Sequence, residues 1–308
     1  MADIIVVGSL NADLVVRAPR FPQPGETIHG EDLQIIPGGK GANQAVAAAR
    51  QGASVTMTGR VGNDSFGPEL IENLKRNDVD ASHVQIDPHS ATGTAIIVVD
   101  ANGQNSIVLS SGGNGKVSRA DVESVSFPDH KLLLLQLEIP IETVLAAAQR
   151  ARASGLRVLL NPAPARSLPD ELITLPDFIL PNEGELSLLT GQPVNDLSSA
   201  EKAARALLER GPQHVIVTLG ANGALIVSKE ITKHVPSFKV DVVDTTAAGD
   251  AFIAGFASAL LENKALEEAV RYGCACGALA VTKFGAQPSL PTKEEVQKLL
   301  DQSPVTNL

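Results

Sequence analysis

The sequence contains no tryptophan and one tyrosine, and aromatic residues make up only 3% of its 308 positions. Hydrophobic residues nevertheless amount to 44% of the chain, which is enough to bury a large core. That core must consist of valine, isoleucine, leucine and alanine, a composition typical of a parallel β-sheet covered by helices. A chain of this length forms one large α/β domain or two smaller ones.

Cysteine is almost absent as well. The two cysteines, Cys274 and Cys276, lie two positions apart in an alanine-rich helical segment, where they cannot easily form a disulfide with each other. Neither a histidine nor a third cysteine follows them closely in the sequence, so they do not form a zinc motif. We expect both to be packing residues of a protein in a reducing compartment.

Excess positive charge and long apolar runs are also missing. The net charge of −10 and the pI of about 5.1 argue against nucleic acid and anionic membranes as partners. No apolar run reaches the ~18 residues that span a bilayer. The start of the chain, with a strand-like Ile4–Val7, lacks the basic region and apolar core of a signal peptide. The sequence therefore predicts a cytoplasmic protein.

Short aliphatic runs alternate with amphipathic helical patterns along the chain. Strands are predicted at Ile4–Val7, Val55–Thr58, Leu132–Gln136, Arg157–Asn161, Phe178–Leu180, Val215–Leu219 and Ala224–Val227. Helices are predicted at Gly41–Gln51, Ile141–Ser154 and Ala200–Arg210, each followed by the glycine that commonly ends a helix. This alternation predicts βαβ units, and hence an α/β fold: a three-layer α/β/α sandwich with a mostly parallel central sheet.

Two stretches interrupt the alternation. Residues 13–36 contain strand-like runs between proline- and glycine-rich turns, without a helical pattern. Thr94–Val99 and Ser106–Ser110 flank Asp100-Ala101-Asn102-Gly103-Gln104, which is a strong hairpin signal. We therefore expect a small β-sheet lid, inserted from about 13–36 and 93–110 into a single domain that spans residues 1–308.

The most informative segment of the sequence runs from Val242 to Phe252. An apolar run ends in Asp244, passes through small residues to Gly249-Asp250, and then opens a helix. The free N–H groups at a helix start can receive an anion such as a phosphate. A carboxylate at that place, Asp250, suits a base that deprotonates a hydroxyl attacking a phosphoryl group. The alternative is that Asp250 simply caps the helix.

Two polar segments near the N-terminus suggest a ligand site. Gly38-Gly39-Lys40-Gly41-Ala42-Asn43 opens a helix but matches neither the Walker P-loop nor the Rossmann fingerprint. Asn11 and Asp13 follow the first strand, and the carboxyl ends of parallel strands are where α/β sheets bind ligands. Together these segments could bind a polyol, or they could be ordinary tight turns.

Two further strand ends carry polar or glycine-rich segments. Asn182 and Glu185 lie one helical turn apart and could share a Mg²⁺–water shell, although a helix N-cap with its capping-box glutamate explains the pattern almost as well. The loop Thr218–Gly223 could face a nucleotide or could be a simple turn.

Taken together and in this order, these segments resemble the ribose-phosphorylating members of the PfkB-type carbohydrate kinase family. The motifs are N-x-D after the first strand, Gly-Gly-Lys-Gly-Ala-Asn, Pro-Asn-Glu-x-Glu, Thr-Leu-Gly-x-x-Gly and Asp-Thr-x-Ala-Ala-Gly-Asp, with Gly285-Ala286-Gln287-Pro288-Ser289 near the end. The resemblance spans essentially the whole chain. It implies ATP-dependent phosphorylation of D-ribose at the 5-hydroxyl, Mg²⁺ with the ATP, an activating K⁺ ion, and a homodimer formed through the lids.

The resemblance also implies roles for individual residues. Asp250 would be the catalytic base, and the amides of Ala247, Ala248 and Gly249 would form the anion hole. The sugar would be held by Asn11, Asp13, Gly39, Lys40, Asn43 and Glu138 together with Asp250. ATP would contact Asn182, Thr218, Gly220, Gly223, Gly249 and Cys274, with Glu185 binding Mg²⁺ through water. The monovalent cation would be bound by Asp244, Thr246, Ala280, Lys283, Gly285 and Ser289.

Composition favours a small neutral pentose among the possible acceptors. A sugar phosphate requires basic residues, yet the expected pocket offers three acids against Lys40 alone. A nucleoside base favours aromatic neighbours, and Phe21 is the only phenylalanine, tyrosine or tryptophan in the first lid segment. Another small sugar or nucleoside (2-deoxyribose, adenosine) is the alternative substrate, and a non-catalytic sugar-binding protein on the same fold is the alternative class.

Overall fold

The structure is a computed structural model that describes residues 3–101 and 104–303. A nine-stranded sheet forms the centre of the molecule. Its strand order is β13-β12-β11-β10-β9-β8-β1-β4-β5, and every pair from β11 to β5 is parallel, whereas β12 and β13 are antiparallel. The strands are β1 Ile4–Val7, β4 Val55–Gly62, β5 Val79–Asp87, β8 Leu132–Leu135, β9 Arg157–Leu160, β10 Phe178–Ile179, β11 His214–Thr218, β12 Ala224–Val227 and β13 Thr232–Val235.

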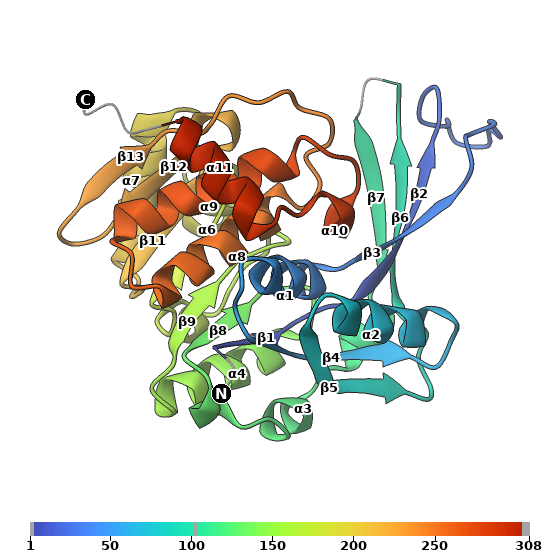
Figure 1. The fold of residues 1–308 in the computed structure, drawn as a ribbon, viewed down its shortest axis with the longest axis horizontal. Coiled ribbons are helices and arrows are strands. Elements are labelled where there is room, and N and C mark those ends of the chain that lie inside the picture. The colour runs from blue at the N-terminus through green and yellow to red at the C-terminus, as the bar shows by residue number, and fades with distance from the viewer. Residues whose placement is uncertain (1–2, 102–103, 304–308) are drawn as a thin grey trace.

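Helices cover both faces of this sheet, and α1, α8, α9 and α11 lie in front of it in Figure 1. The helices that pack on this face are α1 Lys40–Arg50, α2 Phe66–Arg76, α8 Ala248–Leu261, α9 Leu266–Ala280 and α11 Lys293–Gln302. The opposite face is covered by α3 Arg119–Glu123, α4 Ile141–Ala153, α5 Asp170–Ile173, α6 Glu183–Thr190 and α7 Leu197–Leu208. The predicted three-layer α/β/α sandwich is therefore confirmed.

Strand β1 shows why aliphatic runs produce this architecture. Successive side chains of a strand point to opposite faces. Ile4 and Val6 accordingly belong to one hydrophobic core, Ile5 and Val7 belong to the other, and all four side chains are fully buried. A strand buried on both faces must be apolar at every position, which is the pattern read from the sequence.

A second sheet of four strands stands beside the main body, at the right of Figure 1. It contains β3 Gln34–Gly38, β2 Asn11–Arg17, β6 Gly93–Val99 and β7 Asn105–Ser110, in that order. Its inner face holds a small cluster of Val15, Ile36, Ala95 and Ile97. The predicted small β-sheet is confirmed, and we keep the name lid for these four strands. We also predicted that the lid and the main body form a single domain, and this stays a prediction.

The predicted elements are present, with ends that differ by three residues or fewer, except that β4 continues four residues past its predicted end at Thr58. Gly52, Gly155 and Gly211 follow α1, α4 and α7 with positive φ angles, as expected for helix ends. Strands β6 and β7 pair antiparallel as a hairpin, although Asn102 and Gly103 of its predicted turn lie outside the described residues. The edge strands β5 and β13 were not predicted, because partly exposed edges carry polar residues that weaken the aliphatic signal.

Short helical pieces complete the fold. They are the 3₁₀ turns η1 Gly112–Lys116, η2 Phe127–Asp129 and η3 Gly220–Asn222, and the single-turn helix α10 Ala286–Ser289. Within the described part of the chain, no helix is both long and apolar enough to cross a membrane. Both cysteines lie buried as free thiols in α9.

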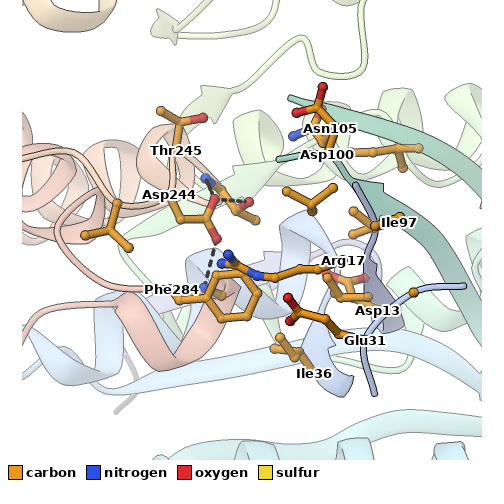
Figure 2. Close-up of a pocket in the computed structure, with 18 of the residues that line it drawn as sticks. Asp13, Arg17, Glu31, Ile36, Ile97, Asp100, Asn105, Asp244, Thr245 and Phe284 are labelled. Carbon is orange, nitrogen blue, oxygen red and sulfur yellow. Dashed lines mark hydrogen bonds between the residues drawn. The ribbon is translucent and has the colours of Figure 1, made fainter. Parts of the chain in front are cut away.

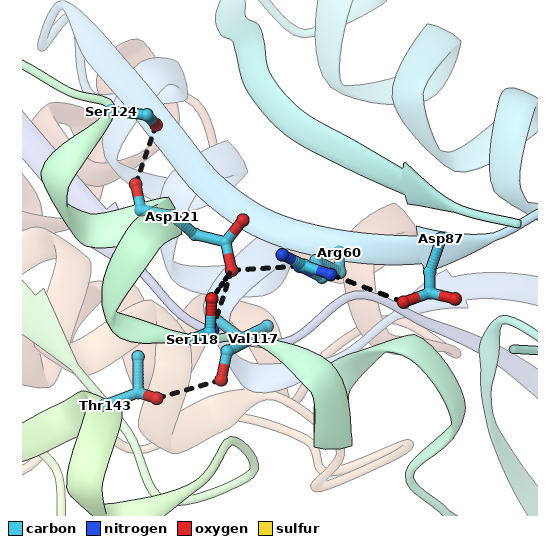
Figure 3. A network of polar contacts seen from close by, with 7 residues as sticks. All are labelled: Arg60, Asp87, Val117, Ser118, Asp121, Ser124 and Thr143. Atoms are coloured by element: carbon cyan, nitrogen blue, oxygen red, sulfur yellow. Dashed lines mark hydrogen bonds and ion pairs between the residues drawn. The ribbon is translucent and has the colours of Figure 1, made fainter. Parts of the chain in front are cut away.

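An ion pair with a buried carboxylate joins α3 to the edge of the central sheet (Figure 3). Arg60 of β4 donates from Nε to Asp121 at 2.9 Å and from Nη1 to Asp87 of β5 at 3.3 Å. The Asp121 carboxylate is only 4% exposed and also accepts from the backbone N–H and the hydroxyl of Ser118. Since a buried charge is stable only when its partners are in place, this contact should carry more stability than the surface pairs.

We therefore predict that Arg60→Ala lowers the free energy of unfolding by about 3 kcal/mol, because it leaves the buried Asp121 carboxylate on α3 without its cation. Glu123→Ala is the matched control on the same short helix. Glu123 pairs with Arg119 on the surface, and losing that pair should cost less than about 1 kcal/mol. Urea denaturation measures both, and equal losses would contradict the buried-pair interpretation.

Candidate active site

Two cavities are lined by predicted site residues. The first, about 870 Å³, lies between the lid and the loops around Asp244 and Phe284, and we call it the lid cleft (Figure 2). The second, about 790 Å³, runs along the ends of β10 and β11 and the start of α8, and we call it the strand-end cleft. Asp13, Asp244, Thr246 and Gly285 line the first. Lys40, Asn182, Glu185, Thr218, Gly220, Gly223, Ala247, Ala248, Gly249, Asp250 and Cys274 line the second.

Asp250 sits in the first turn of α8 and is 5% exposed. Its Oδ2 accepts a hydrogen bond from Asn43 Nδ2 and its Oδ1 accepts one from Gln44 Nε2, both at 3.0 Å. These donors come from α1, so the carboxylate bonds to another helix, and α8 has no side-chain capping bond of its own. Two bonds hold the carboxylate in one orientation beside the strand-end cleft.

The segment before Asp250 forms the start of α8. Ala247 is the N-cap residue and has a left-handed backbone, with φ of 59°. The turn it makes starts the helix at Ala248, and the first N–H groups of a helix have no acceptor within the helix. Since Ala247–Gly249 line the strand-end cleft and carry small side chains, an anion can approach these amides closely.

Glu138 ties the predicted polyol segments together. Its Oε2 accepts hydrogen bonds from the Ser9 hydroxyl and from the backbone N–H of Lys40, at 3.0 Å for the latter. It thereby joins the loop after β1 to the start of α1. Gly39, with φ of 88°, turns the chain into α1 so close to Leu10 and Asn11 that a side chain would collide with their backbone.

Asn11 and Asp13 both lie at the start of β2, where the lid leaves the main body. Asn11 Oδ1 accepts from Asn114 Nδ2 at 2.7 Å, which leaves the Asn11 amide nitrogen as a donor. The Asp13 carboxylate lies against Gly38, at which any side chain would overlap it. Asn43 Oδ1 is buried and has no hydrogen-bond partner among the described residues. The site thus holds acceptors and donors suited to hydroxyl groups.

Carboxylates outnumber cations in this region, and the pKa values reflect it. Burial, with the charges of Glu138 and Asp250, raises the pKa of Asp13 to about 7 against the lowering effect of Lys40. For Lys40, burial lowers the pKa, but the carboxylates, Asp250 foremost, outweigh it and leave the pKa above its usual value. Lys40 therefore stays protonated as the cation that faces these acids.

The expected nucleotide residues gather along the strand-end cleft. Asn182 forms an isolated parallel bridge with Thr218, so the two predicted segments are neighbours. The Asn182 side chain accepts from the Glu185 backbone N–H, and the Glu185 carboxylate accepts from the Asn182 backbone N–H at 2.9 Å. These two bonds form the predicted capping box at the start of α6. Burial raises the pKa of Glu185 and of Cys274, the latter to about 12, so the Cys274 thiol stays neutral. Gly220 and Gly223 both have positive φ angles in the loop.

The expected cation residues form a second pair of adjoining loops. Asp244 Oδ1 accepts from the backbone N–H of Thr246, and Oδ2 accepts from that of Gly285, both at 2.9 Å. Ser289 is fully buried and donates to the Ala286 carbonyl, while the Ala280 carbonyl accepts from the Lys283 N–H. The Asp244 side chain thus joins the segment before α8 to the segment after α9, as do backbone hydrogen bonds from Val243 and Asp244 to the Val281 carbonyl.

Comparison with known proteins agrees with this geometry. The pfkB family carbohydrate kinase model matches residues 1–293. The chain belongs to the PfkB family of carbohydrate kinases. The ribokinase of Haemophilus influenzae is 45% identical over 302 residues, covering 97% of this chain and 99% of that protein. The deoxyribokinase of Salmonella typhi is 40% identical, covering 97% and 98%.

A solved structure described as Arabidopsis thaliana ribokinase complexed with ribose and ATP is also similar to this PfkB-family chain. It superposes with a TM-score of 0.89 at 35% identity, covering 97% of this chain and 98% of that one. The predicted family and fold are therefore confirmed.

Several residues of this PfkB-family site were not predicted. Gln44 bonds directly to Asp250, Gln136 and Asn161 lie behind it, and Ser9 and Asn114 hold Glu138 and Asn11. Gln44 follows Asn43 directly and Gln136 opens the segment that carries Glu138, so both stood beside predicted residues. Asn114 gave no sequence signal, because its partner is 103 residues away.

The raised pKa of Asp13 predicts a stability effect that depends on pH. A folded-state pKa of about 7, against 3.8 for the free group, means that the folded state loses stability as the pH rises from 4 to 8. Asp13→Asn should therefore raise the free energy of unfolding by at least about 2 kcal/mol at pH 8, and leave it nearly unchanged at pH 4.

Asp64 is the control of opposite sign. Burial raises its pKa, but hydrogen bonds from Thr92, Gly67 and Phe66 lower it overall. Asp64→Asn should accordingly destabilise the protein by nearly the same amount at pH 8 and at pH 4, because the stability that a lowered pKa contributes is lost only as the pH falls below 3.8. Chemical denaturation at both pH values measures each variant. An Asp13→Asn effect that is the same at pH 4 and pH 8 would refute a raised pKa for Asp13.

Proposed function

We propose that the protein transfers the γ-phosphoryl group of ATP to the 5-hydroxyl of D-ribose, giving ribose 5-phosphate and ADP. The observation that carries this proposal is the position of Asp250, a buried carboxylate that two side-chain amides hold in the first turn of α8. The ribokinase from Haemophilus influenzae and the Arabidopsis ribokinase described with ribose and ATP support ribose as the substrate.

Each side of the site then has a chemical task. Asp250 accepts the proton of the attacking hydroxyl, and the amides of Ala247, Ala248 and Gly249 receive the charge of the transferred phosphoryl group. The sugar hydroxyls bond to Asn11, Asp13, Gly39, Lys40, Asn43 and Glu138. The nucleotide lies along the strand-end cleft against Asn182, Thr218, Gly220, Gly223, Gly249 and Cys274.

ATP is used as its Mg²⁺ complex, and the metal neutralises phosphate charge. Glu185 fits a water-mediated contact, because its carboxylate lines the strand-end cleft and is 7% exposed. Its two oxygens already accept from Asn182, so direct metal ligation would compete with the helix cap.

2-Deoxyribose is the second candidate acceptor, because the Salmonella typhi deoxyribokinase is 40% identical to this chain over nearly its full length. The two sugars differ by one hydroxyl. ADP release with ATP and Mg²⁺ should therefore be measured with ribose, 2-deoxyribose, fructose 6-phosphate and adenosine. Preference for ribose supports the proposal, preference for 2-deoxyribose replaces it, and activity with none of them supports a sugar-binding protein without catalysis.

Asp250→Asn is expected to lower kcat by at least the ~10²–10⁴ typical of a general base, with ribose affinity nearly unchanged. The variant keeps the shape of the side chain and loses its basicity. Asp241→Asn, an exposed carboxylate in the segment before α8, is the control and should retain activity. Steady-state rates and calorimetric ribose binding provide the data, and more than a tenth of wild-type kcat in Asp250→Asn would exclude it as the base.

We further propose that a K⁺ ion binds between the two loops that Asp244 joins. The proposed ligands are Asp244 and oxygen atoms of Thr246, Ala280, Lys283, Gly285 and Ser289. They fit an alkali cation in kind, since Asp244 supplies one negative charge and the others supply neutral carbonyl or hydroxyl oxygens. An ion there would immobilise the segment that leads into the α8 amides without touching the substrate.

In a buffer free of sodium and potassium, such as Tris, the rate should rise several-fold when K⁺ is added. The change should be mainly a higher kcat or a lower KM for ATP. Asp244→Ala should abolish this response. Asp241→Ala, three residues earlier and exposed, should preserve it. Full activity without any added cation would rule the site out.

We also propose that the protein forms a homodimer through the lid, because the outer face of the lid carries exposed apolar side chains. Ile35, Ile96 and Val108 lie in one row across the sheet and are 56%, 52% and 64% exposed. Contiguous exposed apolar rows mark interaction surfaces, and a second copy offers a matching one. Val108→Glu should yield monomers in sedimentation velocity, whereas Leu188→Glu, an exposed leucine on α6, should not.

We also propose a cytoplasmic location, because Cys274 and Cys276 are free thiols of the kind that a reducing compartment maintains. Cell fractionation tests it, and recovery of the protein outside the cytoplasm would reject it.

A further inference from the structure

Three buried amide side chains form a chain behind Asp250. Gln44 and Gln136 are fully buried and Asn161 is 7% exposed. Gln136 Nε2 donates to Gln44 Oε1 at 2.6 Å, and Gln44 Nε2 donates both to Asp250 Oδ1 at 3.0 Å and to Asn161 Oδ1 at 3.3 Å. The chain thus links α1, the segment after β8 and the segment after β9 to the carboxylate.

The orientation of these amides follows from a single backbone group. The Leu180 carbonyl can only accept, so the Asn161 side chain must direct its Nδ2 toward it, as it does at 3.2 Å. Asn161 Oδ1 then faces Gln44 and requires a donor there. Gln44 must therefore direct Nε2 toward Asn161 and Asp250, which leaves Oε1 to accept from Gln136.

Gly8 provides the space that this arrangement requires. It follows β1, and a side chain at this position would overlap Gln136 Oε1. The Gln136 amide can therefore lie directly beside the backbone of Gly8. Gln136 Oε1 has no hydrogen-bond partner among the described residues. Within this group of amides, Gln136 therefore bonds through its Nε2 alone, to Gln44.

We infer that Gln44 is a positioning residue for the catalytic base and that Gln136 and Asn161 determine which end of the Gln44 amide faces it. Asn43 bonds to Oδ2 of Asp250 and Gln44 bonds to Oδ1, so the carboxylate cannot rotate and its remaining lone pairs stay directed at the acceptor hydroxyl. A neutral amide stabilises the carboxylate without offering a proton that the reaction could take. This inference rests on the proposed function, in which Asp250 deprotonates the sugar.

Gln44→Met tests the inference, because methionine fills a similar volume and makes neither bond. A misplaced base costs on the order of 10²-fold in rate. We expect kcat to fall by about that factor, while the KM for ribose and the KM for ATP stay close to wild type, since Gln44 touches neither ligand in the proposed arrangement.

Gln51→Met is the matched control. Gln51 directly follows the same helix, is 4% exposed, donates to the Pro291 carbonyl and accepts from the Tyr272 hydroxyl. The Gln51→Met variant therefore loses buried hydrogen bonds of the same kinds as Gln44→Met, but at a site distant from Asp250. Its thermal midpoint should fall with kcat near wild type, and a kcat loss as large as that of Gln44→Met would overturn the inference.

Gln136→Met supplies a second and independent measurement. Without Gln136 the Gln44 amide is less firmly oriented, so kcat should fall, but by less than in Gln44→Met. Because Gln136 acts only through Gln44, the double variant should have the kcat of Gln44→Met alone. If Gln44→Met does not fold, the kcat and KM values of Gln136→Met decide the question by the same split.

Retention of more than half of wild-type kcat in Gln44→Met, or kcat effects that multiply in the double variant, would overturn the inference. Failure of the proposed function gives different results. In that case the wild-type protein does not release ADP with ribose, or Asp250→Asn remains active. A working enzyme with an inactive Asp250→Asn and an unaffected Gln44→Met rejects the inference about Gln44 alone.

Discussion

The bond between the Asp250 carboxylate and the amides of α1 is the contact on which the rest of the site depends. It joins residues that are 206 and 207 positions apart in the chain and closes the gap between α1 and α8. A charge buried to this extent is tolerated only when donors surround it. The same donors that make the carboxylate stable also direct it, so stability and chemistry share one set of contacts.

The charges around Asp250 show what this arrangement costs. Asp13, Glu185 and Asp250 are each at least nine-tenths buried, and the half-buried Glu138 adjoins them, with Lys40 as the counter-charge. A fold selected for stability alone would not gather like charges, since burial and the charges of Glu138 and Asp250 raise the pKa of Asp13. In the proposed function the acids are instead acceptors for sugar hydroxyls. The destabilisation is then a consequence of binding a polyol.

The lid relates to the site through its base. Asn11 and Asp13 lie where β2 leaves the main body, and Asn114, just after β7, holds Asn11 by a buried hydrogen bond. Strand β2 and the segment after β7 are thus both attached at residues of the proposed polyol site. Its inner face lines the lid cleft, and Arg17 stacks on Phe284 next to the Asp244 loop at 4.5 Å (Figure 2). The lid is therefore in contact with both the proposed sugar residues and the proposed cation loop.

Much of this was determined by the sequence alone. Aliphatic runs such as Ile4–Val7 and Leu132–Leu135 were recognisable because strands buried on both faces must be apolar at each position. The segments around Asn43, Asn182 and Asp250 were recognisable because a helix start combines capping residues and glycine in a short stretch. The family resemblance then related them to one reaction.

Tertiary structure decided the rest, because the deciding contacts join residues far apart in the chain. Whether Asp250 caps its own helix or bonds to another depends on where α1 lies, which no local pattern encodes. Glu185 proved to form the capping box that the sequence left open. The pKa of Asp13 depends on burial and on charges from three other segments. The roles of Gln44, Gln136 and Asn161 depend on a backbone carbonyl at Leu180, and hydrogen-bond polarity can be assigned only when both partners are in place.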